Sequence, residues 1–241
     1  MRKLSFLITG LIILFLAQQA KADLLGDLLK GVTAPSSKGS GLDNDTVVSG
    51  LKEALSVGTK NAVTSVSKTD GYFGNQMIKI LMPEKIRNVA DVLGKVGFQK
   101  QVDDFVLAMN RAAEKAAPEA TDYFVGAIKE MTLQDGQKIL NGGNTAATDY
   151  FKSKTSHKLY TAFKPIVSRS MEEVGVARAY KNMMSSYSSL PFMKAESLDV
   201  DDYVTNKALE GLFYMVAQEE QKIRTNPAAR TTEILKKVFG R

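Results

Sequence analysis

A carboxylate on an apolar helix face is the residue of this sequence that most needs a chemical explanation. Glu219 falls at the centre of an apolar stripe in the helix predicted from about Asp199 to Arg224. The stripe is formed by Ala208, Leu212, Met215, Val216 and Ile223. A carboxylate in that position must be paired, protonated or directed into a cavity. We therefore predict that Glu219 is buried and paired with Arg111 or Arg230, and the alternative is a ligand pocket lined by Glu219.

Two further groups of polar residues accompany this carboxylate. Glu220 and Arg224 lie to one side of the stripe, four residues apart, which favours an ion pair on an exposed part of the helix. Asn110, Arg111 and Glu114 belong to an alanine-rich predicted helix. Arg111 and Glu114 project opposite its apolar stripe, so they are either exposed or covered by a second layer, and the alanine content favours the second layer. The candidate binding residues are Asn110, Arg111, Glu114, Glu219, Arg224 and Arg230.

The residue types of established catalytic and metal sites are missing or isolated. His157 is the only histidine and cysteine is absent, so a zinc site would depend almost entirely on carboxylates. Asp199, Asp201 and Asp202 do not continue as an EF-hand loop, and the helix dipole already favours acids at a helix start. No glycine-rich phosphate loop follows a strand, and no serine lies in a nucleophile elbow. We therefore predict no catalytic residue, no cofactor and no bound metal.

Charge is concentrated at the C-terminal end of the chain. The net charge is +6, of which residues 1–22 contribute three positive charges and no negative ones. From Lys222 onward there are six basic residues and one acidic residue, so the remainder of the chain is close to neutral. Such a tail is typical of a solvated helix end, and peripheral contact with an anionic surface is the alternative. Nucleic-acid binding is not favoured, because the body of the chain is not basic.

The first 22 residues have the order of a secretory signal peptide. Arg2 and Lys3 precede an apolar run from Leu4 to Leu16, and the small residues Ala20 and Ala22 follow. The apolar run has 13 residues, which is shorter than the roughly 20 needed to cross a bilayer. We predict cleavage after Ala22, a periplasmic location and no membrane span in the mature chain.

The mature chain is predicted to hold one helical domain. Residues 23–43 combine a short leucine-rich helix with a flexible Ser-, Gly- and Pro-rich linker, and residues 44–241 form the domain. Helical periodicity runs through nearly all of that domain. Thr132 and Asp135 have the spacing of a capping box that opens a short helix, whereas Pro118 predicts a bend or a restart of the helix and Pro165 predicts a kink.

One segment departs from the helical period. From Met77 to Met82 the apolar residues alternate, as they do in a strand, but Tyr72 and Phe73 offer the only nearby strand partner. A lone strand needs a partner, so this segment is either a small hairpin or an extended connector. We predict an all-α fold, a single irregular helical bundle with at most one small β element near residues 72–82.

Several motifs of the mature chain carry a resemblance to a known family. They are GLKEAL at 50–55, DGYF at 70–73, MNRAAE at 109–114, ATDYF at 147–151, YVT at 203–205, GLF at 211–213, EE at 219–220, IR at 223–224, NP at 226–227, ARTT at 229–232 and VFG at 238–240. In these motifs the chain resembles the exported bacterial family called domain of unknown function 4197. The resemblance implies an envelope protein of Gram-negative type, and it implies no activity and no catalytic residue.

Taken together, these patterns favour a binding role. We predict a non-enzymatic periplasmic binding or interaction module of the cell envelope, whose partner is an envelope protein or a small ligand. The alternative is a hydrolase or transferase that uses a Glu/Arg-lined pocket. A free carboxylate of Glu219 in a pocket would favour the enzyme, and an interior filled by Arg–Glu pairs would favour the binding module.

Overall fold

The computed structural model describes residues 44–191 and 198–226. The predicted signal peptide at 1–22, the predicted helix and linker at 23–43, and residues 227–241 with Arg230 lie outside these described residues. The two described ranges confirm the all-α fold, because every regular element in them is a helix.

Eight α-helices and two short 3₁₀ helices make up the described ranges. They are α2 (Asn44–Val66), η1 (Glu84–Ile86), α3 (Arg87–Lys95), α4 (Gln99–Ala116), η2 (Ala117–Glu119), α5 (Ala120–Glu130), α6 (Leu133–Asn141), α7 (Ala146–Val174), α8 (Val176–Ser188) and α9 (Val200–Thr225). None of these helices has the combination of length and apolar character that a membrane span requires.

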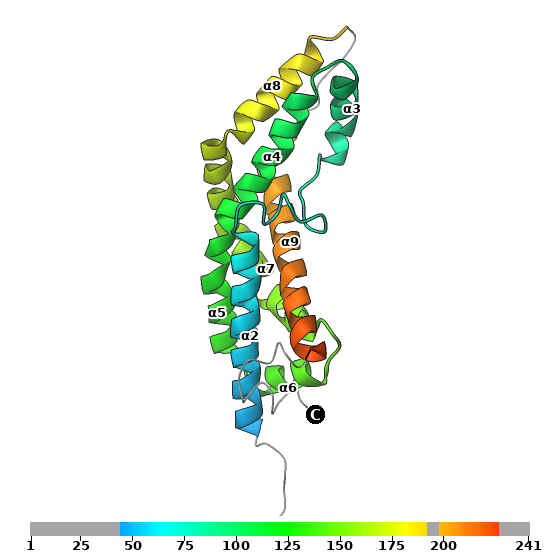
Figure 1. Cartoon of the computed structure of the whole chain (residues 1–241). Coiled ribbons are helices and arrows are strands. Elements are labelled where there is room, and N and C mark those ends of the chain that lie inside the picture. The colour runs from blue at the N-terminus through cyan, green and yellow to red at the C-terminus, as the bar shows by residue number, and fades with distance from the viewer. Residues whose placement is uncertain (1–43, 192–197, 227–241) are drawn as a thin grey trace, which may run out of the picture. The chain divides into compact units, whose positions relative to one another are not determined.

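Helix α9 packs against three other helices of the described bundle. It packs against α7, α2 and α4, while α4 also packs against α7 and α8 (Figure 1). Aromatic side chains fill the interior between these helices: the Phe124 ring of α5 lies 5.3 Å from that of Phe151 and 6.0 Å from that of Phe213. Because α9 is covered by three helices, its buried surface is wider than one apolar stripe.

Local sequence signals set several helix boundaries. The Thr132 side chain accepts the backbone N–H of Asp135 at 3.1 Å, and the Asp135 carboxylate accepts the N–H of Thr132, which confirms the capping box before α6. The Thr132 hydroxyl also donates to the Asp135 carboxylate at 2.7 Å, and this bond, together with the one from the Thr132 N–H, lowers the pKa of Asp135. The side chain of Asp199 caps α9 in a similar way by accepting the N–H of Asp202.

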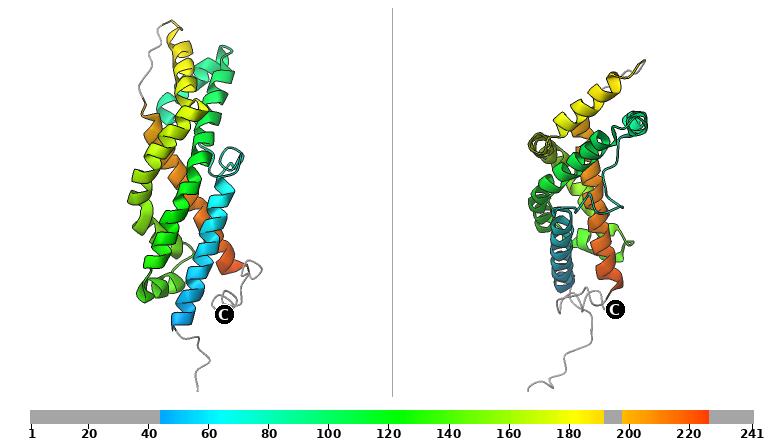
Figure 2. Two further views of the ribbon diagram at one scale, coloured as in Figure 1. Left: turned by 90° about the vertical axis from the view of Figure 1, so that its left-hand side faces the viewer. Right: turned by 45° about the horizontal axis from the view of Figure 1, so that its top comes forward.

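Two prolines lie within this part of the chain, Pro118 between α4 and α5 and Pro165 inside α7. At Pro118 the chain forms the 3₁₀ turn η2, after which α5 continues in nearly the direction of α4 (Figure 2). The restart predicted at Pro118 is therefore confirmed. Helix α7 runs through Pro165 without ending, and the kink predicted there stays a prediction.

The alternating segment forms no strand in the described residues. The connector, which we define as residues 67–83 between α2 and η1, consists of turns followed by an irregular stretch. Ile78 and Ile80 are nevertheless buried, whereas Met77 and Leu81 are exposed. The segment thus forms no hairpin in the described residues: residues 76–78 lie in a turn, and residues 79–83 continue as an irregular connector.

Glycines in α2 and α9 give a matched stability test. At Gly58 an added Cβ would lie 3.5 Å from Glu219 Cβ and 3.5 Å from Ile223 Cδ1, which is ordinary contact. At Gly211 it would lie 2.7 Å from Tyr72 Cε1 and 3.1 Å from Ile78 Cβ. Gly58→Ala is therefore expected to raise the free energy of unfolding by about 0.5–1 kcal/mol through helix propensity. Gly211→Ala is expected to lower it by about 1–2 kcal/mol through overpacking, as measured by urea denaturation.

The two substitutions control each other, because both place alanine in a helix interior. Equal changes in the free energy of unfolding would show that helix propensity alone determines the effect of both substitutions. The close approach of the connector to α9 would then make no contribution to stability.

Candidate functional site

The side chain of Asn110 in α4 takes the place of a strand partner for the connector. Its Oδ1 accepts the backbone N–H of Ile80 at 2.8 Å, and its Nδ2 donates to the carbonyl of Ile80, also at 2.8 Å. The same Nδ2 donates to the carbonyl of Val106. Asn110 is fully buried, so these bonds satisfy polar groups that have no access to water.

Glu114, one turn further along α4, holds the start of the connector. Its Oε1 accepts the backbone N–H groups of Tyr72 at 3.1 Å and Phe73 at 3.2 Å. Its Oε2 accepts a hydrogen bond of 2.7 Å from Arg111, which also binds Asp70 at 2.7 Å. The hydrogen bond to Glu114 raises the pKa of the Arg111 guanidinium. The second layer predicted over Arg111 and Glu114 is therefore the connector.

Tyr72 ties the connector to α9 on its other side. Its ring is fully buried, and its hydroxyl donates to the carbonyl of Ala208 at 2.7 Å. Burial and the nearby charge of Glu114 raise the pKa of Tyr72 far above its usual value, so the hydroxyl remains a donor. We call Asn110, Arg111, Glu114 and Tyr72 the connector clamp, because they fix the backbone of residues 70–80 between α4 and α9.

The second buried carboxylate is that of Glu220, not of Glu219. Glu220 is 7 % exposed and accepts the backbone N–H groups of Ala147 and Thr148, both at 2.9 Å. These two residues belong to the first turn of α7, where N–H groups have no partner within their own helix. Arg224 donates to Glu220 at 2.9 Å and to the carbonyl of Ile139, in the last turn of α6, at 2.8 Å. One ion pair of α9 thus caps the end of α6 and the start of α7.

The predicted pairing of Glu219 with Arg111 is wrong, whereas its pairing with Arg230, which lies outside the described residues, stays a prediction. The Glu219 side chain is 13 % exposed and pairs with Lys222 at 2.5 Å, while Asn61 of α2 donates to it at 3.2 Å. Arg111 is bound to Glu114 and Asp70 instead. The predicted exposure of Glu220 is also wrong, although its pairing with Arg224 is confirmed.

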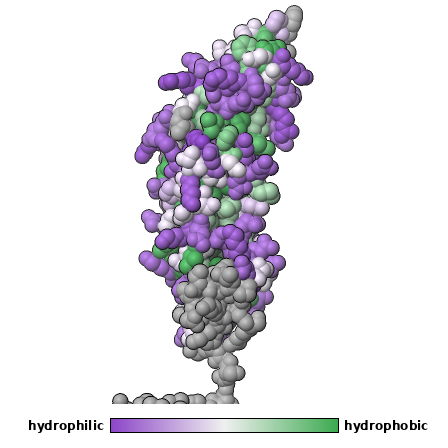
Figure 3. All heavy atoms as spheres, in the orientation of Figure 1, coloured by the Kyte–Doolittle hydropathy of each residue, from purple (hydrophilic) through white to green (hydrophobic). Residues whose placement is uncertain are grey.

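A groove of about 780 Å³ lies between the connector and α9. Its walls come from the connector, η1, the start of α3 and one side of α9. The lining residues are Met77, Ile78, Lys79, Ile80, Leu81, Met82, Pro83, Glu84, Lys85, Arg87, Leu198, Tyr203, Lys207, Glu210, Gly211 and Tyr214. Met77 is 68 % exposed and Leu81 61 %, the highest values among the large apolar residues in the described ranges. The face that carries the connector also shows apolar side chains between hydrophilic ones (Figure 3).

Polar groups of α9 and η1 complete this groove. The Tyr203 hydroxyl donates to the carbonyl of Leu81 at 3.0 Å, and burial raises the pKa of Tyr203. Lys207 pairs with Glu210 at 2.5 Å, and Arg87 pairs with Glu84 at 3.5 Å. The lining holds four basic and two acidic side chains, so the groove has a basic excess contributed by Lys79 and Lys85.

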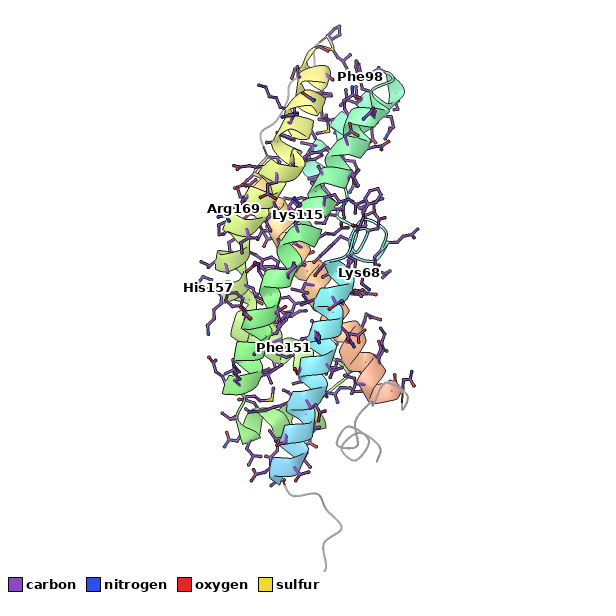
Figure 4. The ribbon with its side chains drawn as sticks, turned by 60° about the vertical axis from the view of Figure 1, so that its left-hand side comes forward. Lys68, Phe98, Lys115, Phe151, His157 and Arg169 are labelled. Carbon is purple, nitrogen blue, oxygen red and sulfur yellow. The ribbon has the colours of Figure 1, made fainter. Side chains whose placement is uncertain are left out.

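The acidic residues at the start of α9 are engaged by α7. Tyr160 donates to Asp202, Lys164 lies 3.5 Å from Asp202, and Ser168 donates to Asp201 at 2.6 Å. The hydrogen bond from Tyr160 lowers the pKa of Asp202. His157 lies at the outer surface of α7 (Figure 4). Within residues 44–191 and 198–226, no cluster of His, Cys, Asp and Glu is arranged to hold a metal ion.

The structure defines an all-α bundle with two Arg–Glu pairs whose carboxylates are buried. One pair holds the irregular connector, which lines an open groove, and the other holds the turn between α6 and α7. The chain belongs to the family described as Protein of unknown function (DUF4197), whose model matches residues 41–240. This confirms the resemblance found in the motifs. Searches of the curated proteins and of the solved structures gave no match to this chain.

The candidate site was only partly accessible from the sequence. The motif MNRAAE contains three members of the connector clamp: Arg111 and Glu114 were identified by their position opposite an apolar stripe, and Asn110 only as their neighbour in the motif. The groove was not identified. The sequence feature that could have indicated the groove is the alternation of residues from Met77 to Met82. This alternation shows that the segment has two different faces, but it does not show which of them is exposed to water.

Proposed function

We propose that this protein is a non-enzymatic binding module of the cell envelope and that its ligand binds in the groove between the connector and α9. The observation that carries this proposal is the combination of a fixed backbone with exposed apolar side chains. The connector clamp holds residues 70–80 in place, while Met77 and Leu81 remain exposed. Exposed apolar residues on a rigid support are typical of interaction surfaces, and methionine adapts readily to a partner.

The arrangement of the carboxylates supports binding over the hydrolase or transferase alternative. Both oxygens of Glu114 and both oxygens of Glu220 accept hydrogen bonds from the protein itself. Neither residue lines the groove. Glu220 and Arg224 do line a cavity, but its volume is about 10 Å³, which is too small for a substrate. A Glu/Arg pair engaged in this way stabilises the fold.

Site-specific photo-cross-linking in intact cells tests the proposed groove. A photoreactive amino acid in place of Leu81 is expected to give a discrete cross-linked product that mass spectrometry can identify. The matched control is the same amino acid in place of Lys129, which is exposed on α5 away from the groove lining. Identical products from both positions, or none from position 81, would contradict the proposal.

Export to the periplasm is part of the same proposal, and it rests on the pattern from Arg2 to Ala22. The intact mass of the protein from a periplasmic fraction is expected to correspond to a chain that starts at Asp23. Recovery of a chain that retains residues 1–22 in the inner membrane would instead identify this segment as an anchor.

A further inference from the structure

We propose that the groove binds an extended peptide segment of a partner protein, and that this peptide forms backbone hydrogen bonds with connector residues 79–81. The inference rests on the proposed function, because it names the class of ligand for the same groove. The lining runs continuously along the chain from Met77 to Lys85, so the groove follows the connector backbone. Opposite this backbone lies the side of α9 that carries Tyr203 and Tyr214.

The hydrogen bonds of the connector identify which of its edges faces the groove. Asn110 occupies both the N–H and the C=O of Ile80 from the α4 side. The C=O of Lys79 lies in one trans peptide plane with the N–H of Ile80, and the N–H of Leu81 lies in one with the C=O of Ile80, so both of these groups point away from Asn110. Tyr203 of α9 donates to the carbonyl of Leu81, which places this second edge on the α9 side.

The second edge carries a donor and an acceptor that a peptide could use. Among the described residues, the N–H of Leu81 and the C=O of Lys79 take part in no hydrogen bond. A neighbouring strand uses these two positions, two residues apart on one edge, for its ladder hydrogen bonds. Peptides that add a strand in this way gain affinity from the backbone and specificity from pockets for alternate side chains. The connector therefore presents a strand-like edge toward α9, on which Tyr203 occupies only the carbonyl of Leu81.

The groove lining indicates the chemistry of the peptide. Apolar and aromatic side chains, among them Met82, Tyr203 and Tyr214, would contact alternate side chains of the peptide. Glu84 and Glu210 are each paired with a basic neighbour, which leaves Lys79 and Lys85 as the basic excess. Lys79 Nζ lies 3.9 Å from the centroid of the Phe73 ring, so its charge is held close to the connector. An extended peptide with alternating apolar residues and acidic ends fits this lining.

Fluorescence anisotropy with the full chain tests the backbone pairing. The probe is a labelled eight-residue peptide that has aliphatic residues at alternate positions and aspartate at both ends. Two N-methylated forms are compared, one methylated at the odd positions and the other at the even positions. Because only one edge of the peptide faces the connector, one form is expected to bind at least about tenfold more weakly, while the other stays within about threefold of the parent.

Two variants of the protein test the same contact from the other side. Leu81→Pro removes the N–H donor and is expected to weaken binding at least about tenfold, whereas Leu81→Ala, which keeps the N–H, should have a smaller effect. Circular dichroism confirms that both variants are folded. Equal sensitivity to the two methylation patterns, or no binding of the probe at millimolar concentration, would overturn the inference. The proposed function would fail separately, through the loss of a discrete cross-link at position 81.

Discussion

Replacing Glu220 with glutamine is expected to lower the free energy of unfolding by about 3 kcal/mol. The carboxylate accepts two N–H groups from the first turn of α7 as well as hydrogen bonds from Thr148 and Arg224. The glutamine amide has one acceptor oxygen, and its NH₂ group would face N–H donors in a buried site. The substitution also removes the negative charge beside the Arg224 guanidinium, which is 14 % exposed. Urea denaturation followed by circular dichroism measures the change.

The matched control is Glu219→Gln at the adjacent position of α9. Glu219 pairs with Lys222, whose side chain is 57 % exposed, so the loss of this ion pair should cost less than about 1 kcal/mol. If Glu219→Gln is instead the more destabilising of the two, the carboxylate that holds α9 in the bundle is Glu219, as the sequence pattern alone had indicated.

Replacing Asn110 with leucine is expected to lower the free energy of unfolding by about 3 kcal/mol and to loosen the connector. Leucine has a similar volume but cannot bind the N–H and C=O of Ile80, and each buried backbone group without a partner costs about 1–3 kcal/mol. Urea denaturation gives the stability. Limited proteolysis with trypsin gives the local effect, because cleavage after Lys79 should become faster once the connector opens.

Asn206→Leu serves as the control for Asn110→Leu. Asn206 is exposed on α9 and binds Asp202 of its own helix, so this substitution should change stability by less than about 0.5 kcal/mol. Equal effects of the two substitutions, together with unchanged cleavage after Lys79, would show that the connector keeps its conformation without the bonds from Asn110.

The features predicted correctly from the sequence are those that depend on local chemistry. The capping box at Thr132 and Asp135 forms within one turn of chain, and the restart at Pro118 follows from the missing N–H of proline. Helical periodicity gave the all-α class because it depends only on residues three or four apart. The spacing of Glu220 and Arg224 likewise predicted their ion pair.

The burial of Glu220 could not be predicted in this way. One apolar stripe on α9 has its centre near Glu219, but the buried residues follow a row with a spacing of four. The row consists of Val204, Ala208, Leu212, Val216 and Glu220. This row is inclined to the helix axis, and α9 is covered by α2, α4 and α7 at once. A shift of one residue rotates a side chain by about 100°, which is enough to exchange the roles of two neighbouring glutamates.

The groove could not be predicted from the sequence either, because it depends on contacts between distant residues. The alternation of Met77 to Met82 resembles that of many strands, and its partner is one amide side chain 30 residues away. No local pattern identifies Asn110 as that partner, because its role depends on where α4 lies relative to the connector.

The caps supplied by Glu220 also affect the order in which the chain can fold. Ala147 and Glu220 are 73 residues apart, and Tyr72 and Glu114 are 42 residues apart. A chain that emerges from its N-terminus therefore presents the first turn of α7 long before the carboxylate that satisfies it. Until residue 220 arrives, the N–H groups of Ala147 and Thr148 must stay in contact with water, and the interior beside α7 cannot close. Completion of the bundle is thus postponed until the chain as far as residue 220 is available.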